Sequence, residues 1–151
     1  MKFHIELSAD YWDKAPQVKV DINNDVVWDG TVINIETIKY EKEILSEEKA
    51  KLNITLYNKQ NDQVILKDGK VIKDQTIHIK RVEIDEIDIE DLIWEAEYTP
   101  IYDPVWYDEQ VADGNTPPQV TKNTQSMGIN GTWCLTFKEP FYLWLLERQI
   151  W

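Results

Sequence analysis

The chain has 151 residues, of which 28 are acidic and 16 are basic, so its formal charge at pH 7 is −12. This length suits one domain, and the acidic excess disfavours binding to the phosphate backbone of nucleic acids. The single cysteine excludes an internal disulfide, and no apolar run approaches the roughly 20 residues of a membrane-spanning helix, so we expect no membrane insertion.

Apolar and polar residues alternate along much of the chain before residue 98, which is typical of half-buried β-strands. The alternation is clearest in residues 3–8, 18–22, 33–36, 52–56 and 77–84. Turn-forming residues at 23–25 and an Asp-Gly pair at 68–69 predict hairpins, which join antiparallel strands. We therefore predict an all-β fold, a single antiparallel β-sandwich of jelly-roll or Greek-key type over residues 1–98.

Two aromatic residues, Tyr11 and Trp12, stand in a polar connection between the first two predicted strands. Flat rings beside carboxylates stack on sugars, and they also anchor protein interfaces. A third interpretation is that Trp12 plugs the end of the sandwich. Tyr11 and Trp12 are therefore sugar-stacking candidates, with the plug and the protein contact left open.

Residues 41–51 interrupt the alternation with charged residues that favour helices. Only Ile44, Leu45 and Ala50 can face a core there. The segment is either one or two exposed helical turns or a solvated loop, and we favour the loop.

An acidic cluster occupies residues 85–91, where Asp85, Asp88 and Asp91 are candidate calcium ligands because calcium prefers hard oxygen donors. A bulge near residues 85–86 can turn several carboxylates to one side. The acidic residues also alternate with isoleucines, which is typical of a strand with a solvated acidic face. We favour the solvated face and expect no cofactor, with calcium as the alternative.

The alternation of apolar and polar residues ends after residue 98. Residues 99–127 contain four prolines and scattered aromatics, which predict an extended arm or loop whose Trp106 and Tyr107 bind a partner. Residues 128–151 predict a strand followed by a short apolar helix that docks on the core or on a neighbouring subunit. The partner-binding residues expected at this end are Phe141, Trp144, Leu145 and Trp151.

The chain offers few residues for catalysis. Its two histidines, His4 and His78, fall on the polar faces of alternating strands, and Cys134 has no charged neighbour to activate it. Motifs of metalloproteases, serine hydrolases and phosphate-binding loops are missing from the sequence. We therefore expect no enzyme and no catalytic residue.

Several short segments carry a resemblance to known proteins. They are Tyr-Trp-Asp-Lys-Ala-Pro at 11–16, Leu-Asn-Ile-Thr-Leu at 52–56, Asn-Lys at 58–59, Ile-Asp-Glu-Ile at 84–87 and the aromatic ending from residue 131. Together they resemble small β-sandwich proteins of tailed bacteriophage particles, which are similar in turn to calcium-dependent xylan-binding modules. Residues 85–88 lack the asparagine and the spacing of the calcium loop in those modules.

The resemblance implies a non-catalytic structural component of a phage particle that bridges other virion proteins in an oligomeric assembly. The alternative is a carbohydrate-binding module that recognises a surface glycan, with or without calcium. The chain begins with charged alternation instead of the apolar run of a signal peptide, so we expect synthesis in the host cytoplasm and a place in the virion.

Overall fold

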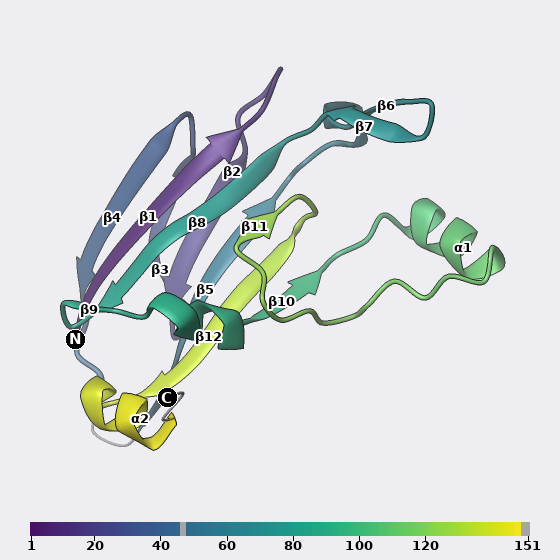
Figure 1. The fold of residues 1–151 in the computed structure, drawn as a ribbon. Coiled ribbons are helices and arrows are strands. Elements are labelled where there is room, and N and C mark those ends of the chain that lie inside the picture. Colours follow the sequence, from purple (N-terminus) through teal and green to yellow (C-terminus); the bar gives the residue numbers. More distant parts are fainter. Residues whose placement is uncertain (46–47, 149–151) are drawn as a thin grey trace.

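The computed structural model describes residues 1–45 and 48–148, without the side chains of residues 90–92. Its centre is a pair of antiparallel sheets stacked face to face, which confirms the predicted β-sandwich (Figure 1). The first sheet contains β1 (Lys2–Asp10), β4 (Ile35–Glu41), β8 (Thr76–Ile84), β9 (Ile87–Asp88) and β11 (Ser126–Met127). The second contains β2 (Gln17–Ile22), β3 (Asp25–Thr31), β5 (Lys49–Tyr57), β10 (Glu97–Pro100) and β12 (Gly131–Lys138).

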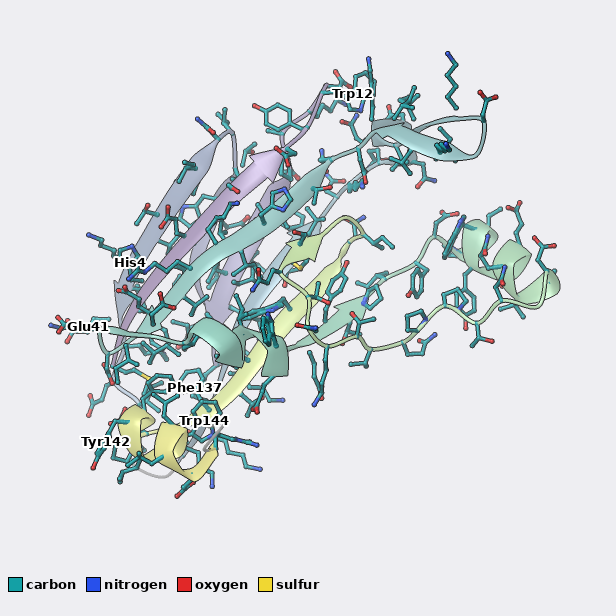
Figure 2. The ribbon with its side chains drawn as sticks, viewed as in Figure 1. His4, Trp12, Glu41, Phe137, Tyr142 and Trp144 are labelled. Atoms are coloured by element: carbon teal, nitrogen blue, oxygen red, sulfur yellow. The ribbon has the colours of Figure 1, made fainter. Side chains whose placement is uncertain are left out.

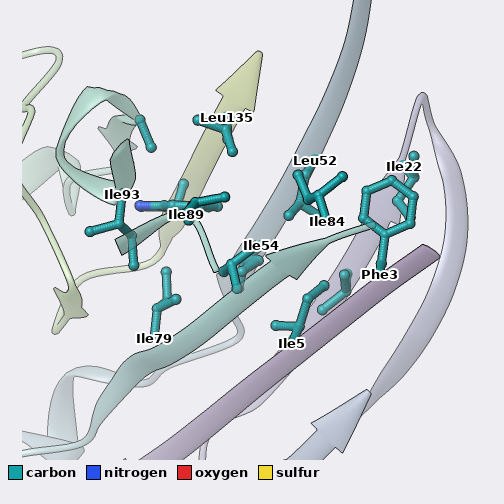
Figure 3. Packing of buried hydrophobic residues seen from close by; sticks show 14 of the residues in the cluster. Phe3, Ile5, Ile22, Leu52, Ile54, Ile79, Ile84, Ile89, Ile93 and Leu135 are labelled. Atoms are coloured by element: carbon teal, nitrogen blue, oxygen red, sulfur yellow. The ribbon is translucent and has the colours of Figure 1, made fainter. Parts of the chain in front are cut away.

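The alternating apolar residues of the two sheets meet in one core. Figure 3 shows part of this cluster, including Phe3, Ile5, Ile79 and Ile84 from the first sheet and Ile22, Leu52, Ile54 and Leu135 from the second. All eight side chains are at most 2% exposed. Burying each such side chain contributes about 1.5–3 kcal/mol, so the period-two pattern is the main stabilising feature of the fold.

The second sheet corrects the expected boundary at residue 98. β12 lies between β10 and β5 and buries Trp133, Leu135 and Phe137, so the sandwich needs a strand from the last part of the chain. Gly131 starts this strand where backbones crowd: a Cβ atom added there would lie 2.4 Å from the carbonyl oxygen of Thr99. Only glycine fits this approach of β10 to β12.

The expected arm at residues 99–127 contains a helix, α1 (Pro104–Ala112). Asp103 caps it, because its Oδ2 accepts a hydrogen bond of 3.1 Å from the backbone N–H of Trp106, and Pro104 suits the first helical turn. The scattered prolines predicted extended chain here, but Asp103 and Pro104 form a favourable helix N-terminus, so part of the arm is helical.

The other elements lie outside the sandwich sheets. They are the hairpin of β6 (Ile65–Lys67) and β7 (Lys70–Lys73), the 3₁₀ helices η1 (Asn61–Gln63) and η2 (Glu90–Glu95), and α2 (Phe141–Arg148). Residues 42–45 and 48 are irregular, as the favoured loop interpretation predicts. Glu41 instead ends β4, and residues 49–51 begin β5, so the expected bounds of 41–51 are too wide at both ends. Among the described residues, every helix is too short or too polar to cross a membrane.

Candidate functional site

Three polar segments meet at one end of the sandwich: residues 11–16 between β1 and β2, residues 58–63 after β5, and residues 74–75 before β8. Together with the start of β2 they enclose a pocket of about 200 Å³. Its lining residues are Lys14, Ala15, Gln17, Asn58, Gln60, Gln63 and Gln75. Five of these seven side chains are primary amides, which both donate and accept hydrogen bonds.

Gln63 is the central residue of the pocket wall and is only 1% exposed. Its Oε1 accepts a hydrogen bond of 3.1 Å from the backbone N–H of Lys14, and its Nε2 donates to carboxylates of Asp13 at 3.0 Å and Asp62 at 3.2 Å. A buried amide with these partners ties η1 to the loop after β1 and keeps the wall in one geometry.

Gln75 is also buried, at 4% exposure. Its Nε2 donates to the carbonyl oxygen of Lys14 at 2.7 Å, and its backbone N–H donates to Oδ1 of Asp74 at 2.7 Å. Its Oε1 has no hydrogen-bond partner within the described part of the chain. A buried acceptor without a partner costs about 1–3 kcal/mol, so this atom favours a ligand that donates a hydrogen bond.

The opposite side of the pocket is held by a second amide chain. Asn58 donates from Nδ2 to Oε1 of Gln17 at 3.0 Å, and Gln60 donates from Nε2 to Oδ1 of Asn58 at 3.0 Å. Asn58 has a φ of 60°, a left-handed conformation that asparagine adopts more readily than most residues. The turn after β5 therefore points amide groups toward the pocket.

Trp12 stands beside this pocket, at the tip of the loop after β1 (Figure 2). Its Nε1 donates a hydrogen bond of 2.8 Å to the carbonyl oxygen of Gln63, yet 42% of the residue is exposed. The ammonium group of Lys73 lies 4.9 Å from the ring centroid. Tyr11 is 37% exposed in the same loop. Trp12 is therefore a fixed and exposed ring, which disfavours the plug interpretation.

A larger pocket of about 500 Å³ lies over the edge of the first sheet where β1 and β4 pair. Figure 2 labels two of its residues, His4 and Glu41. Its lining is mostly charged, and Nδ1 of His4 lies 3.6 Å from a carboxylate oxygen of Glu83. We favour the smaller pocket as the functional site because buried amides shape its wall.

The acidic cluster does not gather a calcium site among the described side chains. Asp85 and Glu86 form the turn between β8 and β9, with φ values of 51° and 66°. The Oδ1 atom of Asp85 accepts the backbone N–H of Lys2 at 2.8 Å, and a carboxylate oxygen of Asp88 lies 3.4 Å from Nε of Arg81. The side chain of Asp91 lies outside the described residues. The side chains of Asp85 and Asp88 thus face different partners.

The aromatic residues of α2 belong to the core of this chain, which corrects their expected role in partner binding. Phe141 and Trp144 are 1% and 5% exposed, and their rings stack with centroids 5.6 Å apart. Both rings also contact Phe137 of β12, as Figure 2 indicates for Trp144. Leu145 is partly buried against the same cluster, and Trp151 lies outside the described residues. A short connection after β12 is what lets the helix fold back onto its own sheet.

Trp106 and Tyr107 lie on α1, away from the sandwich. The ring of Tyr102 stacks on both, with centroids 5.4 Å from Trp106 and 5.8 Å from Tyr107. Trp106 is 41% exposed, and α1 has no buried residue. Trp106 is therefore accessible to a partner and Tyr107 is partly exposed, and their role in partner binding stays a prediction.

Strand pairing also creates a cluster that the sequence did not reveal. Ser126 of β11 is opposite His78 of β8, and its Oγ lies 2.7 Å from Nδ1 of His78, whose Nε2 lies 2.7 Å from Oδ2 of Asp10. This order of serine, histidine and carboxylate is that of serine hydrolases. Hydrolysis also needs oxyanion donors and a shielded cleft, whereas the side chain of Asp10 is 82% exposed. We therefore assign the cluster a structural role in joining β1, β8 and β11.

Cys134 is no better placed for catalysis. Burial raises the pKa of its thiol, so the protonated form persists near neutral pH.

No protein-family model and no curated protein matches the sequence. Among solved structures, the chain is similar to vCBM60 in complex with galactobiose, with a TM-score of 0.53 and 7% identity, over 89% of this chain and 96% of that one. It is also similar to a selenomethionine form of vCBM60, with a TM-score of 0.53 and 6% identity, over 88% of this chain and 87% of that one. The description of that second structure states that circular permutation provides an evolutionary link between two families of calcium-dependent carbohydrate-binding modules. At this identity the likeness shows a shared fold, and nothing in it supports a virion protein.

Proposed function

We propose that this chain binds a glycan, without catalysis, in the amide-lined pocket beside Trp12. The observation that carries the proposal is the Oε1 atom of Gln75, a buried acceptor without a partner among the described residues, in a wall made of amides. Sugar hydroxyls supply the missing donor and accept hydrogen bonds in return.

The shape of the site favours one sugar unit inside the pocket. Its volume of about 200 Å³ is smaller than the roughly 300–1,000 Å³ of sites that bury a drug-sized ligand. The remainder of a glycan then lies outside, where Trp12 and Tyr11 offer apolar ring faces. Lys73 already covers part of the Trp12 ring, so a sugar that stacks on that face displaces its ammonium group.

The fold likeness supports this proposal, because one of the similar structures holds galactobiose. Those modules are calcium-dependent, whereas the described carboxylates of this chain do not gather around one point. We therefore assign the binding to amides and aromatic rings and give calcium no part in it.

The test is glycan binding by the full chain, measured on an array of neutral and acidic oligosaccharides and then by titration calorimetry with the best ligand and with galactobiose. Trp12→Ala should weaken binding at least about tenfold, because central aromatic contacts contribute most of the affinity of small sites. Trp12→Phe, which keeps a ring, should retain part of it. Trp94→Ala is the matched control, since Trp94 is 48% exposed on η2, away from the pocket.

Three results contradict the proposal. One is the absence of binding to every glycan on the array. Another is equal loss of affinity in the Trp12 and Trp94 variants. The third is binding that vanishes when calcium is chelated, which assigns recognition to a metal site elsewhere.

A further inference from the structure

Two appendages extend from the sandwich and bury little of their apolar surface. The first is the hairpin of residues 65–73, formed by β6 and β7, whose Leu66, Val71 and Ile72 are 54–61% exposed. The second is the arm of residues 101–120, which contains α1. Its exposed apolar residues are Ile101, Val105, Trp106, Val111 and Val120.

Neither appendage contributes a strand to the two sandwich sheets. Among the described strands, β6 and β7 pair only with each other, and α1 has no buried residue. A lone two-stranded hairpin and a nine-residue helix are each marginally stable in water. Apolar groups clustered on such elements are typical of surfaces that a partner covers.

The two appendages carry opposite charge. The hairpin has three lysines, Lys67, Lys70 and Lys73, against one acidic residue, Asp68, which leaves a charge of +2. The arm has four acidic residues and neither lysine nor arginine, which leaves a charge of −4; its acidic residues are Asp103, Asp108, Glu109 and Asp113. The hairpin is thus a basic surface on a chain whose overall charge is −12.

We propose that two copies of this chain form a dimer in which the hairpin of each copy packs on the arm of the other. Within one copy the two appendages stand apart, but both extend to the same side of the sandwich (Figure 1). A two-fold axis on that side brings both hairpin–arm contacts together, so the assembly closes and does not grow into a filament. Complementary charge sets the orientation, and the apolar side chains supply the buried area.

This pairing does not depend on the proposed glycan binding. Its test is the oligomeric state of the full chain, measured by sedimentation equilibrium at low and at high salt. The wild-type chain should dimerise, and salt should weaken the dimer because exposed charges are screened.

Charge reversal gives the sharper test. K67E/K70E changes the hairpin charge from +2 to −2, and D108K/E109K/D113K changes the arm charge from −4 to +2. Each variant alone should dimerise at least about tenfold more weakly, since like charges then face each other. An equimolar mixture of the two variants should restore the dimer, because both hairpin–arm contacts are again between opposite charges.

The control is K49E/K51E, which reverses two exposed lysines on β5 and should leave the dimer intact. Circular dichroism verifies that each variant is folded, and the neutral pair K67Q/K70Q, with an expected intermediate loss, replaces any reversal that unfolds. A wild-type chain that stays monomeric at every concentration overturns the proposal. A dimer that resists both reversals, or a mixture that remains monomeric, overturns it as well.

Discussion

Removing one aromatic ring from the α2 contact should cost a large fraction of the stability of the fold. Phe141 is 1% exposed, and its ring meets Phe137 edge-on at 5.8 Å and stacks on Trp144 at 5.6 Å. Phe141→Ala deletes both contacts and leaves a cavity between α2 and β12. Substitutions of this kind cost about 3–5 kcal/mol.

This cost is large compared with the total stability of a domain of this size, which is about 5–15 kcal/mol. With about 2–4 °C of melting temperature per kcal/mol, Phe141→Ala should lower the melting temperature by about 6–20 °C. Tyr142→Ala is the matched control, because Tyr142 is the next residue of the same helix and is 57% exposed. It should change stability by no more than about 0.5 kcal/mol.

The measurement is thermal and urea unfolding followed by circular dichroism. The double variant F141A/W144A should lose less than the sum of the two single changes, since the stacked rings share one contact. Equal, small shifts for Phe141→Ala and Tyr142→Ala would refute the docking of α2 on this core. They would return these rings to the partner-binding role that the sequence suggested.

Three further outcomes are expected. Burial raises the pKa of Tyr98 to about 12, so the unfolded chain loses this proton first and stability should fall between pH 10 and 12; Tyr98→Phe should flatten that fall in pH-dependent melting. The wild-type chain and Ser126→Ala should both hydrolyse an activated ester at the uncatalysed background rate, and a rate above background that is lost in the variant would assign catalysis to the cluster. Asp85→Asn with Asp88→Asn should change the melting temperature equally in calcium and in chelator; a calcium-dependent rise lost in this variant would show a metal site.

The sandwich was predictable because its core residues repeat with a period of two. Phe3, Ile5 and Leu7 show how far this holds: each is buried where alternation places it. The hairpin turn at residues 67–70 was also predictable from adjacent residues, because an Asp-Gly pair favours the positive φ values that Asp68 and Gly69 adopt. These features depend on neighbouring residues, so one sequence suffices to find them.

The site was harder to predict because its parts come from distant segments. Trp12 was named from its exposed, polar surroundings, but its bond to Gln63 spans 51 positions of the chain. The Ser126 and His78 pair depends on β11 joining β8, which alternation cannot reveal. The partner-binding role predicted for the aromatic residues of α2 was wrong for a related reason. Periodicity identifies the apolar face of a helix, but it does not say whether that face packs on the same chain or on another.

The buried position of Gln75 could have been predicted from the residues that follow it in the sequence. Residues 75, 77 and 79 share one side of an extended chain, and Ile77 and Ile79 are buried, so Gln75 continues the inward-facing row of β8. A polar residue in such a row needs hydrogen-bond partners, which makes it more informative than the many exposed amides of this chain.

The same row explains why the pocket keeps its geometry. A slip of β8 by one residue would turn Ile77 and Ile79 to solvent, at a cost of about 1.5–3 kcal/mol for each side chain. The core therefore fixes the register of the strand, and that register places Gln75 in the lining of the pocket. Loop residues such as Trp12 are then positioned by hydrogen bonds to buried residues of the pocket wall, as Nε1 of Trp12 is by its bond to the carbonyl oxygen of Gln63. Recognition chemistry can accordingly change in the loops while the burial pattern of the strands stays the same.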